Sequence, residues 1–185
     1  MTDGTKLFTF GHGTAPQEEI IAILRRAEIE SVVDVRIAPG SRRHPHVARV
    51  ELERWLPDAG IAYRWEPRLG GRRRPAPNSP DTAWRDDAFR GYAGWMRTAE
   101  FNAAVDALLE DATHAHTTVM CSESLWWRCH RRLIADASVL LKLVPVVHVM
   151  HDGRDTAHEA TEWARVTSSR TIVYDIDRSA LPFDS

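Results

Sequence analysis

The chain has 185 residues, of which 43% are hydrophobic and 27% are charged, and its formal net charge is −2. This length and composition are typical of a globular protein with its own core, so we expect residues 1–185 to form a single domain. The slightly acidic balance excludes a protein that binds nucleic acid through overall positive charge. No apolar run approaches the roughly 20 residues that cross a bilayer, so we expect no membrane partner.

The N-terminal residues and the number of cysteines indicate the cellular compartment in which the protein works. Residues 1–6 lack the basic-then-apolar pattern of a signal peptide. The chain contains two cysteines, Cys121 and Cys129. We therefore expect a cytoplasmic protein with free thiols, and a disulfide between these two residues is the alternative.

The first part of the chain alternates between short apolar strands and amphipathic helices. In chain order we expect a strand over 7–10, a helix over 16–27, a strand over 31–36, a helix over about 47–59 and a strand over 61–65. Apolar residues at helical spacing, such as Ile20, Ile23 and Leu24, define the buried face of the first helix. A strand–helix–strand unit of this kind closes as a right-handed parallel crossover.

A long loop rich in proline and arginine, residues 72–84, divides the two halves of the chain. Such a loop is often a lid or binding element, and a mobile segment without function is the alternative. Beyond it we expect, in chain order, helices over 89–98 and 100–113, a strand over 117–121, a helix over 127–143, a strand over 144–149, a helix over 151–165 and a strand or extended tail over 171–174. The alternation predicts an α/β fold, with a mostly parallel sheet of about five strands and helices on both faces.

Several short motifs, in order over roughly residues 6–149, resemble a known family. They are Phe10-Gly11-His12-Gly13-Thr14, Val33-Asp34-Val35-Arg36, Gly60-Ile61-Ala62-Tyr63, Leu69-Gly70-Gly71, Gly91-Tyr92-Ala93-Gly94-Trp95-Met96, Cys121-Ser122-Glu123 and Cys129-His130-Arg131-Arg132-Leu133-Ile134-Ala135. The resemblance is to the uncharacterised proteins grouped as domain of unknown function 488. It implies an α/β fold in a soluble bacterial or archaeal protein, and it implies no particular activity. The chain departs from the family pattern at Leu125-Trp126-Trp127, where the family is more polar and contains proline.

Polar side chains gather where the predicted strands end. They are His12, Asp34, Arg36, Cys121 and Glu123, and Cys129, His130 and Arg131 follow at the start of the next helix. Because the carboxyl ends of parallel strands share one edge, where ligands usually bind, we expect these residues to form one cleft. A structural ion pair is the alternative reading of Asp34 and Arg36.

The cysteines are the candidate reactive groups. A thiol beside a helix N-terminus and several arginines has a lowered pKa, so Cys121 is the expected nucleophile, with Glu123 or His130 as the proton-transfer group. The alternative is that Cys121 is a small buried apolar residue, as free cysteines often are. The spacing from Cys121 to Arg128 is one residue longer than in a phosphatase loop, and no glycine lies between them, which disfavours that class.

Arginine dominates the basic residues, and its planar fork suits phosphate and carboxylate groups. The residues that we expect to contact an anionic or nucleotide-like ligand are His12, Asp34, Arg36, Ser41, Arg42, Gly70, Gly71, Tyr92, Cys129 and Arg131. The predicted function is therefore a small enzyme, a cysteine-dependent transferase or hydrolase, acting on a phosphorylated or nucleotide-like compound. One alternative is a nucleic-acid-binding module in which Trp126 and Trp127 stack on bases. A second alternative is a non-catalytic scaffold with structural cysteines.

The sequence predicts no cofactor and no metal ligands. Zinc is the alternative, because Cys121, Cys129, His130 and His12 have the donor atoms that zinc prefers. The spacing of the two cysteines and the histidine matches no familiar zinc knuckle, and two thiolates are too few for a closed structural site. The sequence gives no indication of the oligomeric state.

Overall fold

A six-stranded sheet lies at the centre of the computed structural model, which describes residues 4–40 and 42–175. Its strand order is β3–β2–β4–β1–β5–β6. The strands are β1 (Leu7–Gly11), β2 (Ser31–Asp34), β3 (Ala62–Trp65), β4 (Thr117–Cys121), β5 (Val146–His148) and β6 (Thr156–Ala157). Neighbours from β3 to β5 pair in parallel, and β6 runs antiparallel beside β5. The predicted α/β class with a mostly parallel sheet is confirmed.

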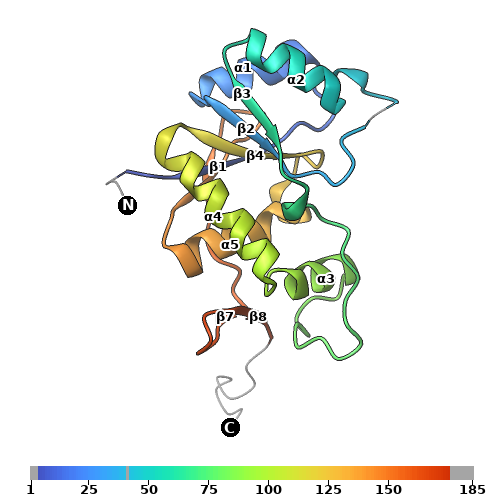
Figure 1. Ribbon diagram of the computed structural model, residues 1–185, viewed down its shortest axis with the longest axis vertical. Helices are drawn as coiled ribbons and strands as arrows, with labels where there is room; N and C mark the ends of the chain where they lie inside the picture. Colours follow the sequence, from blue (N-terminus) through green and yellow to red (C-terminus); the bar gives the residue numbers. More distant parts are fainter. Residues whose placement is uncertain (1–3, 41, 176–185) are drawn as a thin grey trace.

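Helices cover both faces of this sheet (Figure 1). They are α1 (Gln17–Arg26), α2 (Arg49–Asp58), α3 (Asp87–Trp95), α4 (Ala99–His114) and α5 (Arg131–Lys142). Successive strand residues point to opposite faces, so Phe8 and Phe10 join the core beneath α1 and α2, whereas Leu7 joins the core beneath α4 and α5. Among the helices of the described ranges, none is both long and apolar enough to cross a membrane.

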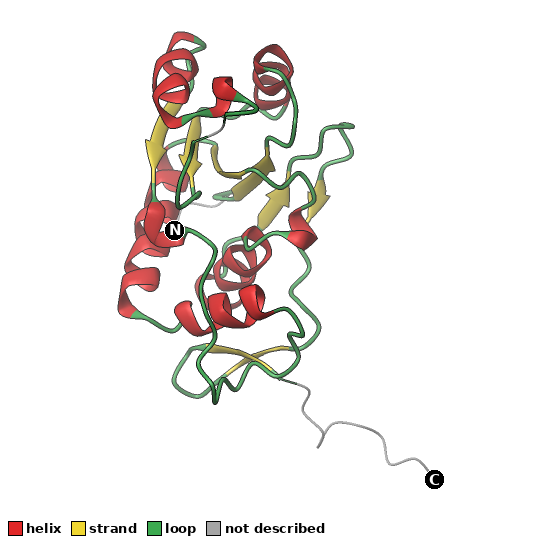
Figure 2. Ribbon diagram, turned by 90° about the vertical axis from the view of Figure 1, so that its right-hand side faces the viewer, coloured by secondary structure: helices red, strands yellow, loops and turns green. Residues whose placement is uncertain are grey.

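The helix predicted over residues 151–165 is wrong. β6 pairs there with the edge of β5, and β7 (Ala164–Val166) pairs with β8 (Ile172–Tyr174) in a separate two-stranded sheet at one end of the molecule (Figure 2). Gly153 turns the chain with a φ of 80°, and His158 is bonded to Asp136 of α5. The turn at Gly153 and the contacts of His158 therefore outweigh the weak helical pattern of these residues. Because β6 joins the sheet, the main sheet has six strands rather than about five. The strand predicted over 171–174 is confirmed by β8.

The last long helix begins later than the sequence predicts. A short 3₁₀ turn covers Trp126–Arg128, and α5 begins at Arg131. Cys129 has extended backbone between the two elements. Cys129 and His130 therefore lie in the connection between β4 and α5, immediately before the N-terminal turn of the helix.

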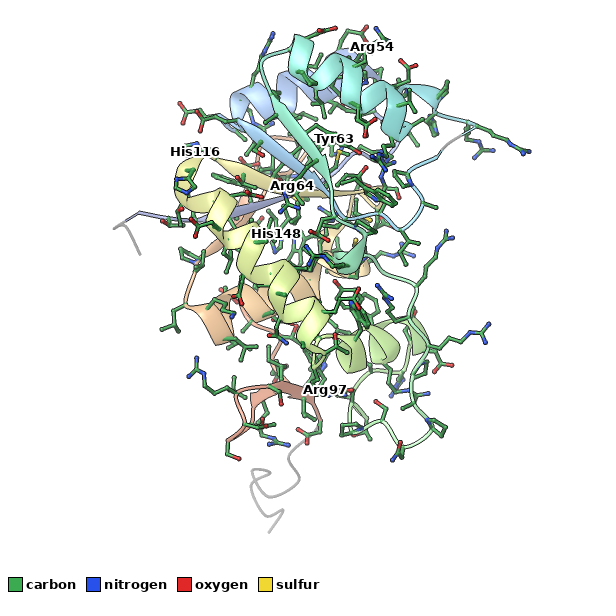
Figure 3. All side chains as sticks on the ribbon, viewed as in Figure 1. Arg54, Tyr63, Arg64, Arg97, His116 and His148 are labelled. Carbon is green, nitrogen blue, oxygen red and sulfur yellow. The ribbon has the colours of Figure 1, made fainter. Side chains whose placement is uncertain are left out.

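The loop over residues 72–84 contains neither a helix nor a strand, and a buried carboxylate anchors its end. Arg97 donates to both oxygens of Asp81, at 2.9 and 2.6 Å, and to the carbonyl of Ile172. Asp81 also accepts from the backbone N–H of Tyr174. Figure 3 shows Arg97 near the β7–β8 pair. This ion pair joins the loop to the C-terminal strands.

A buried chain of polar groups connects β1, β5 and α5. The Nε2 atom of His158 lies 3.0 Å from Asp136, its Nδ1 atom lies 3.0 Å from His148 Nε2, and His148 Nδ1 lies 2.7 Å from the Thr9 hydroxyl. Tyr174 donates its hydroxyl hydrogen to Asp136 at 2.9 Å. Burial, together with the neighbouring His158, lowers the pKa of His148 to about 3. The His148 ring therefore serves as a neutral hydrogen-bonding group in the core.

Candidate functional site

A pocket of about 650 Å³ opens at the carboxyl ends of the parallel strands. His12, Arg36, Cys121, Glu123 and His130 all line it. These side chains come from the ends of β1, β2 and β4 and from the turn before α5. The parallel register brings them together, because it aligns Gly11 of β1 with Cys121 of β4.

Arg36, in one wall of this pocket, is fixed by neighbouring groups. Its Nε and Nη2 atoms donate to the two oxygens of Asp34 at 2.8 and 2.6 Å, and Nη2 also donates to the carbonyl of Val47. Nη1 lies 3.2 Å from His12 Nε2, and His12 Nδ1 lies 2.9 Å from the carbonyl of Gly13. Burial and the Arg36 charge lower the pKa of His12 to about 4, so the neutral ring donates through Nδ1 and accepts through Nε2. The ion pair expected as an alternative reading of Asp34 and Arg36 is present.

Another wall depends on a close backbone approach that glycine allows. A Cβ atom on Gly11 would lie 1.9 Å from the Glu123 carbonyl oxygen and 2.6 Å from Arg131 Nη2. Arg131 donates from Nη2 to that same carbonyl. The Glu123 side chain accepts from the backbone N–H of Leu125 at 3.1 Å. Gly11 and Arg131 therefore set the position of the loop that carries Glu123 into the pocket.

Three donor side chains meet beside this loop. Donor atoms of Cys121, Cys129 and His130 lie within 4.8 Å of one another, and both cysteines are free thiols. A hydrogen bond from the Cys121 thiol, aided by Arg131, lowers the pKa of Cys129 to about 6. The same hydrogen bond and burial raise the pKa of Cys121 well above its usual value. The direction expected for the pKa of Cys121 is therefore wrong, because the Cys121 thiol is buried and donates its hydrogen to Cys129. The Arg131 Nε atom faces the Cys129 sulfur at 3.4 Å.

The ring of His130 is confined between two neighbours. A Cβ atom on Gly71 would lie 2.9 Å from His130 Nδ1, and the Tyr92 ring centroid is 5.1 Å from the imidazole. Burial lowers the pKa of His130, so the ring is neutral near pH 7. Gly71 therefore has a steric role beside the cluster, and it also lines the pocket.

Several expected ligand contacts lie behind the pocket wall or away from it. Asp34, Gly70, Tyr92 and Arg131 are buried and support other site residues, for example through the Tyr92 hydroxyl bond to the Leu69 carbonyl at 2.7 Å. None of these four belongs to the described lining of the pocket. Arg42 is exposed outside it, and Ser41 lies outside the described residues. The buried four hold supporting positions behind the pocket wall, and their contact with a ligand stays a prediction.

The pocket includes residues that the sequence did not single out as ligand contacts. Arg43 and Arg72 line it, together with His44 and Ser124. Both arginines belong to short basic runs in Pro/Gly-rich loops, and that composition was the available signal. The sequence could not show which member of each run turns inward, because this depends on the path of the loop.

The expected role of the tryptophans as base-stacking surfaces is limited by their contacts. Trp126 stacks on His148, with ring centroids 3.9 Å apart and an interplanar angle of 5°. One face of its ring is therefore covered, whereas Trp127 is 44% exposed. In the second basic run, Arg73 lies over the ring of Trp95 at 3.8 Å. Arg73 and Trp126 therefore contact other side chains of the protein.

The fold and the pocket define an α/β protein with a thiol-, histidine- and arginine-containing pocket at the carboxyl edge of its sheet. The chain belongs to the family described as "Domain of unknown function DUF488", whose family model matches residues 16–138. Searches of curated proteins and of solved structures found no significant match. The family assignment agrees with the sequence resemblance and leaves the activity to be argued from the site itself.

Proposed function

We propose that this protein is an enzyme that binds a small phosphorylated or nucleotide-like substrate in the 650 Å³ pocket, with Cys121, Cys129 and His130 at its reacting centre. One observation carries this proposal. Arg43 and Arg72 line the same pocket as Cys121 and His130, so an anion held by the guanidinium groups lies beside the donor cluster.

The charges in the pocket favour an anionic substrate. Arg36 is neutralised by Asp34, but Arg43 and Arg72 are exposed, and the described part of the chain gives neither an acidic partner within ion-pair distance. Arg72 also has a φ of 58°, in the left-handed region that residues with a Cβ atom rarely adopt. Backbone strain of this kind is concentrated at functional sites.

The size of the pocket favours more than a bare inorganic ion. Its volume of about 650 Å³ is within the range of roughly 300–1,000 Å³ that is typical of sites for small organic ligands. Glu123 lines it and is the candidate for moving a proton. A nucleoside monophosphate or a sugar phosphate has suitable size and charge.

Calorimetric titration of the full chain with inorganic phosphate and with adenosine monophosphate tests this proposal. We expect both probes to bind, and Arg43→Glu and Arg72→Glu to weaken binding about tenfold or more, because each loses a charged hydrogen bond. Arg85→Glu is the control, since Arg85 is exposed and outside the pocket lining. Equal affinity in all four proteins, or no binding by wild type, would overturn the proposal.

A further inference from the structure

The donor cluster has the composition and spacing of a metal site. Donor atoms of Cys121, Cys129 and His130 are mutually within 4.8 Å, and His130 Nδ1 lies 3.6 Å from Cys129 Sγ. Tetrahedral zinc with Zn–S bonds of about 2.3 Å and Zn–N bonds of about 2.0 Å separates neighbouring donor atoms by about 3.5–3.8 Å. The three side chains thus approach this geometry without a change of backbone topology.

The surrounding residues hold the three side chains in place. Cys121 ends a central strand, and Cys129 and His130 immediately precede α5. Arg131 Nε donates to the Cys129 sulfur at 3.4 Å, and Gly71 leaves room for the imidazole. Hydrogen bonds to metal-bound sulfur and close contacts to a ligand imidazole are common supports of metal sites.

One nitrogen of the His130 ring faces a weak hydrogen-bond partner. Its Nδ1 atom lies 3.6 Å from the Cys129 sulfur. A cysteine sulfur is a weak donor and a weak acceptor. Ligation of a cation by Nδ1 would give this nitrogen a stronger interaction.

We infer that Cys121, Cys129 and His130 bind one zinc ion, with the fourth coordination position open to the pocket. Cys121 and His130 both line the pocket, so the cluster borders the substrate space, where a fourth ligand from the substrate or solvent can approach. Three protein ligands with one open position are the pattern of catalytic zinc sites. The inference deepens the proposed function, because the open position would lie beside the anion held by Arg43 and Arg72.

His12 does not belong to this ligand set, although its residue type suits zinc. Its Nε2 atom lies 3.2 Å from Arg36 Nη1, and its Nδ1 atom lies 2.9 Å from the Gly13 carbonyl. Both nitrogens are therefore occupied.

Access to solvent favours a ligand role for Cys129 over a nucleophilic one. Its side chain is 4% exposed, and it lines only the smaller adjoining pocket of about 220 Å³ among the pockets described. A nucleophile must reach the substrate, whereas a metal ligand needs only to reach the ion. A divalent ion would also balance the charge of the two thiolates that form when both cysteines bind it.

Cobalt(II) titration of chelator-treated full chain, followed by absorption spectroscopy, tests the inference. We expect one cobalt ion per chain, with thiolate-to-cobalt charge-transfer bands and the visible bands of tetrahedral coordination, displaced by zinc. Cys121→Ser, Cys129→Ser and His130→Gln should each lose these bands. His44→Gln, which alters another pocket residue, should keep them.

A second measurement needs no variant and guards against misfolding. Zinc should protect both wild-type cysteines from alkylation, read by mass spectrometry. Cobalt binding without thiolate bands, or unchanged alkylation in the presence of zinc, would overturn the inference. Phosphate titration of the metal-free wild type separates the two proposals: if phosphate binds and cobalt does not, the zinc inference fails and the proposed function stands.

Discussion

The Nε atom of Arg131 lies 3.4 Å from the sulfur of Cys129, and its Nη2 atom donates to the carbonyl of Glu123. One fully buried guanidinium therefore connects the donor cluster to the loop that carries Glu123. The connection gives the buried charge of Arg131 two acceptors, the Cys129 sulfur and a backbone oxygen.

Removing this guanidinium should destabilise the protein. We expect Arg131→Met to lower the free energy of unfolding by about 1–3 kcal/mol, because the half-buried Glu123 carbonyl loses its charged donor. Urea denaturation measures this change. Arg128→Met, at an exposed neighbouring position, is the control and should change stability by less than about 0.5 kcal/mol. Equal effects of the two substitutions would contradict the structural role given to Arg131.

Gly71 should be required for the position of the His130 ring. In Gly71→Ala the new methyl group would start 2.9 Å from His130 Nδ1, so the imidazole must move. We expect cobalt affinity to fall about tenfold, in line with the effect of disturbed supporting contacts at metal sites. Gly40 lines the same pocket, but a Cβ atom there meets nothing within 4 Å. Gly40→Ala should therefore bind cobalt like wild type, and a parallel loss in both variants would refute the steric explanation.

Arg72→Gly should separate stability from ligand binding. Glycine adopts a φ of 58° without strain, so thermal unfolding should show stability maintained or increased by up to about 1 kcal/mol. Phosphate binding should nevertheless weaken about tenfold, because a charged donor is lost. Glu28→Gly relieves a similar φ of 53° far from the pocket lining and should leave binding unchanged. Intact phosphate binding in Arg72→Gly would show that Arg72 does not contact the anion.

The protein should lose stability as the pH falls below about 6.5. The folded-state pKa values of His12 and His148 are about 4 and about 3, whereas the ordinary value is 6.5. Between these values the unfolded state binds more protons, so stability rises with pH, by up to about 1.4 kcal/mol per pH unit for each histidine. Urea denaturation from pH 7 to pH 4.5 measures this slope.

Single substitutions show whether the buried histidine rings cause this dependence of stability on pH. His148→Gln should reduce it by up to about 1.4 kcal/mol per pH unit, the contribution of one histidine. Substitution of the exposed His114 by glutamine should leave the slope as in wild type. A flat profile in wild type, or a slope that depends on His114, would count against the buried neutral histidines.

The sequence predicts β1 and β4 because both strands are buried on both faces and their hydrophobic pattern is strong. β1 and β4 are short apolar runs, and their parallel pairing places His12, Cys121 and Glu123 at one edge. The convergence of these side chains was therefore predictable from the order of strands and helices alone.

Local pattern could not predict features that depend on tertiary contacts. The path of residues 151–165 is set by the pairing of β6 with the edge of β5 and by the bond from His158 to Asp136. Helical periodicity in the sequence predicts neither contact. The choice of Arg43 rather than Arg42 depends on the path of a loop. The opposite pKa shifts of Cys121 and Cys129 depend first on which thiol donates the hydrogen bond between them, and then on burial and the position of Arg131.

Anion binding in the pocket is tested by a crystal structure of the protein grown with tungstate, a tetrahedral oxyanion that can be located by its anomalous scattering. We expect a tungstate peak in the pocket, within hydrogen-bond distance of the guanidinium groups of Arg43 and Arg72 and on the same side as Cys121 and His130. Tungstate bound only elsewhere, with this pocket free of it at saturating concentration, would show that the pocket is not an anion site.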